Sequence, residues 1–215
     1  MYVVDSSLDL IADLYEAGTL GIIEHDGWVE AWFDDRETAA RFGEPRPAPD
    51  IDWVQQTKDA WPPLLVGEKF FVVAPWRTEP TPPGRFRLEI NPGQQCGTGQ
   101  HPCTQKCLEA MERVIKPGDS VLDVGSGSGI LSIAAKLLGA GRVIACDIDP
   151  EAATNEAPFF VGSIDAVRDG SFDVVVANIN EEVIGRMLPD FKRVARNRIL
   201  SGFQDEDNEW TCVVC

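Results

Sequence analysis

The feature that most constrains this chain is a glycine-rich turn between two apolar segments. Residues 121–124 read Val-Leu-Asp-Val, and residues 130–138 read Ile-Leu-Ser-Ile-Ala-Ala-Lys-Leu-Leu. Between these segments, three glycines occupy alternate positions: Gly125, Gly127 and Gly129. Glycines can adopt positive φ and leave few side chains between a turn and a ligand. The pattern predicts a buried strand that ends at Asp123, a turn, and then a helix.

A carboxylate follows at the distance that is typical of a nucleotide site. Residues 142–146, Arg-Val-Ile-Ala-Cys, predict a second strand, and Asp147 comes directly after it. Asp147 lies about 20 residues beyond the turn, where α/β nucleotide sites place the acid that binds ribose hydroxyls. The strand–turn–helix–strand unit is therefore predicted to hold a nucleoside.

The spacing of the glycines narrows the choice of nucleoside. A dinucleotide site requires a third glycine at the position that Ile130 or Ser132 occupies here, according to where the register starts. No Gly-Lys-Ser/Thr sequence follows, so the turn is not a P-loop. The turn suits S-adenosylmethionine, because Asp123 can hold an ammonium group while Asp147 binds the ribose. The alternatives are another nucleotide or a purely structural turn.

A third apolar segment ends in a polar residue. Residues 172–177 read Phe-Asp-Val-Val-Val-Ala, and Asn178 follows them. Open α/β sheets bind ligands at the carboxyl ends of their parallel strands. Asn178 is therefore a candidate site residue, and the alternative is an asparagine that forms a turn or caps a helix.

The order of the predicted elements indicates two domains. Over residues 1–50 the predicted order is strand, helix, hairpin and helix, which opens a ferredoxin-like α+β module. The predicted segments are residues 2–4, 8–15, 20–24, 28–33 and 36–42. Residues 51–90 are assigned to a linker with connecting strands. Residues 91–215 alternate strands and helices, which predicts an α/β domain with a mostly parallel sheet.

The chain is strongly acidic, with 35 Asp and Glu against 19 Lys and Arg and a net charge of −16. Nucleic-acid binding depends on Lys and Arg, so this surface would repel RNA and attract a basic protein. Simple solubility is the other explanation. No apolar run approaches the roughly 18 residues of a membrane span, and the N-terminus lacks a signal-peptide pattern. We expect a cytoplasmic monomer with no membrane contact and no direct contact with nucleic acid.

The cysteines raise the question of a zinc site, but their spacing does not favour one. Cys103 and Cys107 are four residues apart on a predicted helix, just after His101. Structural zinc sites usually use Cys-x-x-Cys pairs. Cys212 and Cys215 have that spacing, but residues three apart on a strand point to opposite faces. We expect buried thiols and no metal.

Four motifs occur together in a fixed order. They are Cys-Gly-Thr-Gly-Gln-His-Pro-Cys-Thr at 96–104, Leu-Asp-Val-Gly-Ser-Gly-Ser-Gly-Ile-Leu at 122–131, Asp-Ile-Asp-Pro at 147–150 and Val-Ala-Asn-Ile at 176–179. The set closely resembles the ribosomal protein L-eleven methyltransferases of the PrmA type. The resemblance covers about residues 50–203. It implies a Rossmann-like class I methyltransferase domain that binds S-adenosylmethionine, preceded by a small α+β domain that recognises the substrate.

The resemblance also implies roles for individual residues. Four residues stand where the family binds S-adenosylmethionine: Thr104, Gly125, Asp147 and Asn178. Thr98 and His101 would belong to the loop that covers the cofactor. The family methylates lysine side chains and N-terminal amines, so the expected partner is a basic ribosomal protein. The alternatives are another protein, an RNA or a small molecule as acceptor, or a non-catalytic protein that binds a partner.

Methyl transfer to an amine requires positioning and exclusion of water more than acid or base catalysis. The amide oxygen of Asn178 and nearby backbone carbonyls are predicted to orient the amine lone pair. His101 is predicted to brace its loop through a hydrogen bond, and the alternative is a general base.

The chain departs from the family motifs at several positions. Four departures lie beside the expected cofactor and need not abolish its binding: Cys96, Gln100, Cys103 and Ser126. Asn180 replaces the leucine that follows Asn-Ile in the family and would alter the rim of the catalytic site. Residues 150–160 and 203–209 are shorter than the resemblance implies. Either the protein is trimmed there or segments are missing from this sequence, and we favour the second explanation.

Overall fold

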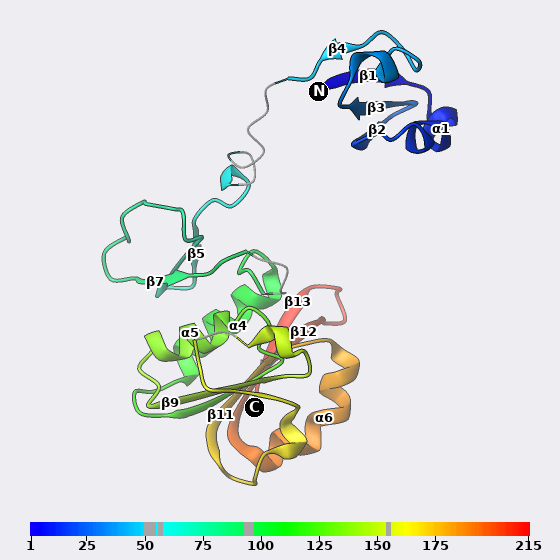
Figure 1. Ribbon diagram of the computed structural model, residues 1–215. Coiled ribbons are helices and arrows are strands. Elements are labelled where there is room, and N and C mark those ends of the chain that lie inside the picture. The colour runs from blue at the N-terminus through cyan, green and yellow to red at the C-terminus, as the bar shows by residue number, and fades with distance from the viewer. Residues whose placement is uncertain (50–54, 56–57, 93–96, 154–155) are drawn as a thin grey trace. The chain divides into compact units, whose positions relative to one another are not determined.

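The computed structural model describes residues 1–49, 55, 58–92, 97–153 and 156–215, and Figure 1 shows its helices and strands. The chain forms two compact units, residues 1–57 and residues 58–215. Each unit has buried hydrophobic residues of its own. Cys96, one of the departures from the family motifs, lies outside the described residues.

The N-terminal unit is an antiparallel sheet with short helices. Its elements are β1 (Tyr2–Ser6), the 3-10 helix η1 (Leu8–Leu10), α1 (Ile11–Glu16), β2 (Gly21–His25), β3 (Trp28–Phe33), α2 (Arg36–Ala39) and β4 (Arg46–Pro47). The strands are ordered β2-β3-β1-β4, and every neighbouring pair is antiparallel. Alternate residues of β3, namely Val29, Ala31 and Phe33, are buried in one cluster with Leu14 of α1. This is the split βαβ arrangement of the predicted ferredoxin-like module.

The second unit begins with a small sheet. β5 (Leu64–Val66), β6 (Phe70–Val73) and β7 (Phe86–Glu89) form three strands, in which β6 pairs antiparallel with β5 and parallel with β7. Phe70 and Leu88 are fully buried in the same cluster as Met111 of α4 (Pro102–Val114). The sequence analysis assigned residues 51–90 to a linker with connecting strands, and β5, β6 and β7 lie within that range. Their apolar side chains belong to the core of the second unit.

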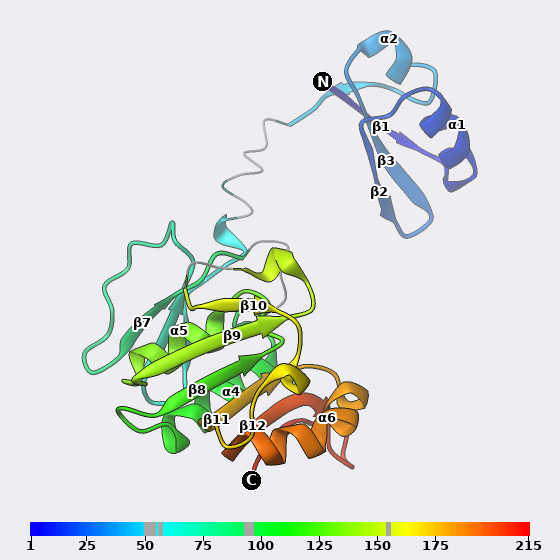
Figure 2. The same ribbon diagram turned by 60° about the horizontal axis from the view of Figure 1, so that its bottom comes forward.

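A six-stranded sheet forms the centre of the second unit. Its strands are β8 (Ser120–Val124), β9 (Arg142–Asp147), β10 (Phe159–Val161), β11 (Phe172–Asn178), β12 (Ala195–Gln204) and β13 (Trp210–Val214). Their order is β10-β9-β8-β11-β12-β13, and Figure 2 shows β10, β9, β8, β11 and β12 side by side. All neighbours are parallel except β12 and β13. The structure therefore confirms the predicted α/β class with a mostly parallel sheet.

Helices cover both faces of this sheet. α4 and α5 (Ile130–Leu137) pack on one face, and α6 (Glu181–Val194) packs on the other. Successive strand residues point to opposite faces. Accordingly, Val174 and Val176 of β11 pack with α4 and α5, whereas Val175 and Ala177 pack with α6. The same alternation directs Asn178, at the end of β11, to the side of α4.

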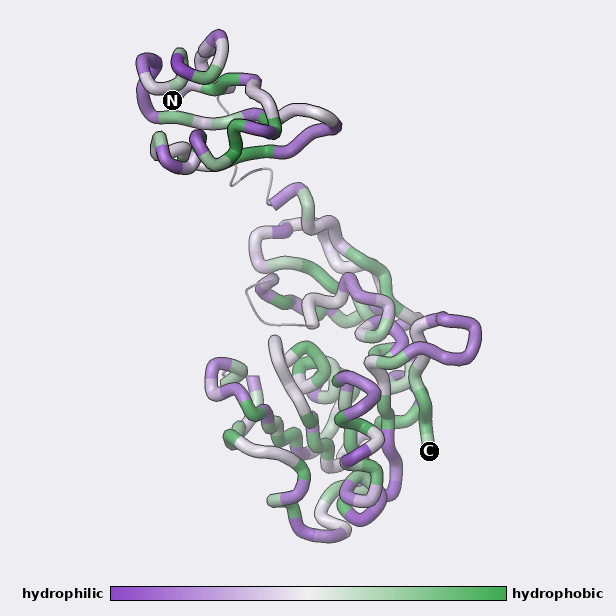
Figure 3. The backbone as a smooth tube through the Cα atoms, turned by 90° about the vertical axis from the view of Figure 1, so that its right-hand side faces the viewer, coloured by the Kyte–Doolittle hydropathy of each residue, from purple (hydrophilic) through white to green (hydrophobic). Residues whose placement is uncertain are grey.

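Hydrophobic and hydrophilic residues alternate in short stretches along the chain (Figure 3). The acidic turn between β12 and β13 is a hydrophilic loop in which Asp205 Oδ1 accepts hydrogen bonds from the N–H groups of Asp207 and Glu209, at 3.1 and 3.0 Å. This short connection joins β12 and β13 in an antiparallel hairpin. Within the described ranges, no helix combines the length and the apolar character that crossing a membrane requires.

Candidate active site

The predicted strand–turn–helix unit is present, and its turn has the backbone that glycine allows. Gly125, Gly127 and Gly129 have φ values of 70°, 48° and 80°. Gly129 is the N-cap of α5, which begins at Ile130. A Cβ atom at position 125 would lie 2.4 Å from Cγ2 of Ile179. The glycine therefore lets the loop after β11 approach the turn closely.

Asp123 lies at the end of β8 and is fully buried. Its Oδ2 accepts a hydrogen bond of 2.7 Å from the hydroxyl of Ser132 in α5, whereas its Oδ1 has no partner among the described residues. Burial raises the pKa of this carboxyl from 3.8 to about 6. The unpartnered Oδ1 is available for the predicted contact with an ammonium group.

Asp147 connects the end of β9 to the glycine turn. Its Oδ2 accepts a hydrogen bond from the N–H of Gly127 and its Oδ1 accepts one from the N–H of Asp149, both at 3.0 Å. Each carboxylate oxygen has two lone pairs. Both oxygens can therefore hold the turn and still accept hydrogen bonds from ribose hydroxyls.

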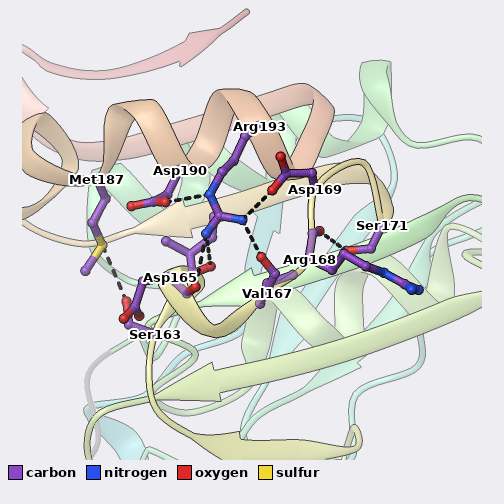
Figure 4. Close-up of polar contacts among 10 residues, drawn as sticks. Ser163, Asp165, Val167, Arg168, Asp169, Ser171, Met187, Asp190 and Arg193 are labelled. Atoms are coloured by element: carbon purple, nitrogen blue, oxygen red, sulfur yellow. Dashed lines mark hydrogen bonds and ion pairs between the residues drawn. The ribbon is translucent and has the colours of Figure 1, made fainter.

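Arg193 of α6 fixes the loop that follows β10 (Figure 4). Its guanidinium donates to the carboxylates of Asp190 and Asp169, at 2.7 and 2.8 Å. It also donates to three backbone carbonyls, those of Ile164, Asp165 and Val167. The loop begins directly after Val161, which pairs with Asp147 in the parallel ladder of β9 and β10. Arg193 thus anchors a segment that starts beside the carboxylate at the turn.

Asn178 and Thr104, which the family resemblance assigned to one site, are in direct contact. Nδ2 of Asn178 donates a hydrogen bond of 3.0 Å to Oγ1 of Thr104, which is buried in α4. No described residue donates to Oδ1 of Asn178. The next residue, Ile179, donates its N–H to the carbonyl of Ser201 at 3.0 Å. These two bonds hold the side chain of Asn178 and the backbone of Ile179 at the start of the loop after β11.

The ring of His101 caps α4. Its Nδ1 accepts a hydrogen bond of 3.3 Å from the N–H of Cys103, and the ring meets Trp210 edge-on, with centroids 4.6 Å apart. An Nδ1 atom that accepts a hydrogen bond carries no proton, so the proton of the neutral ring lies on Nε2. Protonation of Nδ1 would remove the cap. This cap is a contact of the kind that the bracing role requires, and the choice between bracing and a general base stays a prediction.

The loop before His101 is tied to both the turn and α4. The hydroxyl of Ser128 donates to the carbonyl of Gly97 at 2.6 Å. Nε2 of Gln105 donates to the carbonyls of Gly99 and Gln100, at 3.2 and 3.0 Å. This loop therefore lies beside the glycine turn, as expected for a segment that covers a ligand.

Thr98 is placed differently from the other predicted residues. It lines a shallow pocket together with Trp61, Val72 and Ile90. None of the described residues that line this pocket belongs to the glycine turn. Within the described ranges, no side-chain hydrogen bond joins Thr98 to another predicted cofactor residue, and its role stays a prediction.

Two features of the site were missed by the sequence analysis. Gly202 has a φ of 107°, and a Cβ atom there would lie 1.8 Å from the carbonyl oxygen of Ile179. A glycine inside an apolar segment is the available signal, since it marks a close backbone approach. Asn180 caps α6, because its Oδ1 accepts a hydrogen bond of 3.0 Å from the N–H of Val183. This departure from the family motif is thus explained by helix capping.

Unpartnered polar atoms mark the turn as a place for a ligand. Oγ of Ser126 and Oδ1 of Asp123 are buried and have no partner among the described residues. Buried polar groups are normally hydrogen-bonded. Together with Asp147, these atoms form a set of acceptors that suits a ligand with ammonium and hydroxyl donors.

Comparison with known proteins identifies the family. The model of a family described as "Ribosomal protein L11 methyltransferase (PrmA)" matches residues 33–210, which is most of the chain. The chain belongs to this family. The match includes the glycine turn, Asp147 and Asn178, and it extends beyond the range predicted from the motifs.

Individual relatives agree with this assignment. A ribosomal protein L11 methyltransferase of Burkholderia pseudomallei is 46% identical over 149 residues, which are 66% of this chain and 49% of that protein. A protein of the same name from Burkholderia lata is 46% identical over 142 residues, covering 62% of this chain and 47% of that protein. The chain thus spans about half the length of the curated relatives it matches.

A solved structure supports the fold of the PrmA family for this chain. The ribosomal protein L11 methylase of Lactobacillus delbrueckii subsp. bulgaricus is 29% identical, with a TM-score of 0.59. The similarity covers 66% of this chain and 80% of that one. The second unit therefore has the Rossmann-like class I methyltransferase fold that the motifs predicted.

Proposed function

We propose that the chain is an S-adenosylmethionine-dependent protein N-methyltransferase that acts on lysine or N-terminal amines of a large-subunit ribosomal protein. Membership of the PrmA family supports the reaction and the class of acceptor. The observation that carries the proposal is the approach of the loop after Asn178 to the glycine turn at Gly125, where a Cβ atom would lie 2.4 Å from Ile179. A methyl donor and an amine acceptor can meet at such an edge of a sheet.

The glycine turn and its neighbours would bind the cofactor. Asp147 would accept hydrogen bonds from the ribose hydroxyls. Asp123 Oδ1 and Ser126 Oγ, which have no partner among the described residues, would bind the donors of the amino-acid end. When bound, S-adenosylmethionine supplies an electrophilic methyl group on a sulfonium. The loop from Gly97 to His101 would cover this side and exclude water.

Asn178 would position the amine. Its Nδ2 is used by Thr104, so Oδ1 is the atom that would accept a hydrogen bond from the amine N–H. Holding the reacting atoms in line supplies the main part of the rate enhancement, since the reaction needs little proton transfer in its chemical step. His101 contributes by keeping α4, and with it Thr104, in place.

The acceptor fits the charge of the chain. A net charge of −16 would attract a basic ribosomal protein and repel free nucleic acid. We assign acceptor recognition to the N-terminal unit, residues 1–57, with its ferredoxin-like sheet. We propose that the protein works as a monomer in the cytoplasm, without direct contact with nucleic acid or membrane.

Two measurements on the full chain test this proposal. Calorimetric titration with S-adenosylmethionine tests cofactor binding, and we expect a single site that the Asp147→Ala variant weakens. Labelled methyl transfer to purified large-subunit ribosomal proteins, with RNA as a parallel substrate, then tests the acceptor. Binding without transfer to any protein would favour the non-catalytic alternative, and transfer to RNA alone would replace the proposed acceptor.

A further inference from the structure

Two cysteines far apart in sequence face the same side of the central sheet. Cys212 of β13 is the register partner of Ser201 of β12, and residues directly opposite in an antiparallel ladder point to the same face. The hydroxyl of Ser201 reaches the carbonyl of Cys103 in α4 at 3.4 Å, so this face is the one that α4 covers. Cys107 lies one helical turn beyond Cys103, and Cys212 packs against the hydrophobic cluster that contains Cys107.

The two thiols differ in environment and in acidity. Cys107 is fully buried, whereas Cys212 is half-buried, and both are free cysteines. The hydrogen bond with Cys107, together with the positive charges of Arg113 and Lys106, lowers the pKa of Cys212. The hydrogen bond with Cys212 and burial raise the pKa of Cys107. Cys212 is thus the more acidic thiol of the two.

We propose that Cys212 and Cys107 form a hydroperoxide-reactive pair that closes reversibly into a disulfide between β13 and α4. In the first step the thiolate of Cys212 attacks the O–O bond of a hydroperoxide, which yields a sulfenic acid and releases hydroxide or alkoxide. In the second step the sulfur of Cys107 attacks the sulfenic sulfur, and the S–S bond forms as the Cys107 proton leaves with the hydroxyl group as water. The peroxide is reduced by the two electrons that the thiols lose.

The position of the pair links its oxidation to the candidate active site. Cys212 stands two residues after Trp210, whose ring meets His101, and Cys107 stands three residues after Thr104, which holds Asn178. A disulfide needs Cβ atoms about 3.8 Å apart, so closing it would fix the spacing of α4 and β13 at these two residues. Oxidation is expected to lower methyl transfer, and this consequence alone rests on the proposed function.

The test uses the reduced full chain exposed to hydrogen peroxide under native conditions. After alkylation of the remaining thiols, peptide mass spectrometry should find Cys107 linked to Cys212, with two thiols lost and then recovered after dithiothreitol. Cys212→Ser should protect Cys107 from oxidation. Cys107→Ala should leave Cys212 as a sulfenic or sulfinic acid, without a disulfide.

Cys215→Ser is the matched control, because Cys215 is an exposed thiol directly after the same strand. This variant should form the linked peptide as the wild type does. Oxidation of Cys215 without any link between Cys107 and Cys212, in the wild type, would overturn the proposal. Because the linked peptide is measured without an activity assay, its absence is distinguishable from a failure of the proposed methyl transfer.

Discussion

At the scale of single residues, the site is defined by how each polar atom is used. Asn178 and Asn180 are two residues apart, yet the first binds Thr104 at the carboxyl end of β11 and the second caps α6. Asp123 and Asp147 both flank the glycine turn, yet one is fully buried and the other bonds to the turn backbone. Each pair therefore offers matched variants, in which the same type of side chain is replaced at two positions that make different contacts.

Variants of the two asparagines should affect methyl transfer and stability separately. We expect Asn178→Ala to lower kcat by roughly a hundredfold, because a misplaced acceptor loses the effective concentration that orientation provides. Its affinity for S-adenosylmethionine should be partly retained. Asn180→Ala should cost about 1 kcal/mol of stability through loss of a helix cap, with kcat close to that of the wild type. Turnover assays, calorimetry and urea unfolding measure these effects, and unchanged turnover of Asn178→Ala would refute its role.

His101 can be tested with a residue that caps a helix but is no base. Asparagine is a preferred N-cap residue, so we expect His101→Asn to retain most of the activity and His101→Ala to lose both stability and activity. The measurement is kcat together with the melting temperature. If His101 is a general base, both variants should lose activity equally, whatever their stability.

Asp123 should make stability depend on pH in a specific direction. Its pKa in the folded protein, about 6, lies above the ordinary value of 3.8. Between these values the folded state binds more protons than the unfolded state, so the free energy of unfolding falls as pH rises through this window, by about 3 kcal/mol at most. Asp123→Asn should remove this slope.

Urea unfolding of wild type and variant at several pH values between 4 and 7 measures the difference. Other carboxylates titrate in both proteins, so only the difference between the two curves reports on Asp123. Parallel curves would show that the buried carboxyl does not have the raised pKa.

At the scale of elements, the periodicity of apolar residues predicted individual helices and strands. It did not predict contacts between segments that lie far apart in the sequence. The strand from Arg142, the helix after the glycine turn and the strand ending at Asn178 were predicted, because their alternating or continuous apolar residues report their own burial. Residues 51–90 were assigned to a linker with connecting strands, and the packing of β5, β6 and β7 against α4 was not predicted because α4 lies far away in sequence. Gly202 and the Arg193 contacts were missed for the same reason.

Arg193 offers a prediction at this scale. Lysine lacks the planar fork that reaches two carboxylates and several carbonyls at once. Arg193→Lys should therefore lower the melting temperature by several degrees and weaken binding of S-adenosylmethionine, because the loop after β10 begins beside Asp147. The control is Arg186→Lys on the same helix, since Arg186 is an exposed residue 3.8 Å from Glu182. Equal effects of the two variants would contradict the anchoring role.

At the scale of the whole molecule, membership of the PrmA family and the acidic surface point to one kind of acceptor. The chain carries a net charge of −16, and opposite charges on two proteins speed their encounter in a way that salt suppresses. The residues that we propose to bind the cofactor belong to the second unit, whereas we assign recognition of the acceptor to the N-terminal unit. A higher salt concentration should therefore weaken recognition of the acceptor more than it weakens binding of the cofactor.

The most direct test is the mass of a purified large-subunit ribosomal protein of the family's substrate type after incubation with the full chain and S-adenosylmethionine. We predict a mass increase by whole methyl groups, located by fragmentation on lysine side chains or on the N-terminal amine. The increase should be absent with Asn178→Ala at the same enzyme concentration and time, and kcat/KM should fall as salt rises while cofactor affinity stays constant. An acceptor of unchanged mass, with S-adenosylmethionine bound by the enzyme, would contradict the proposed function.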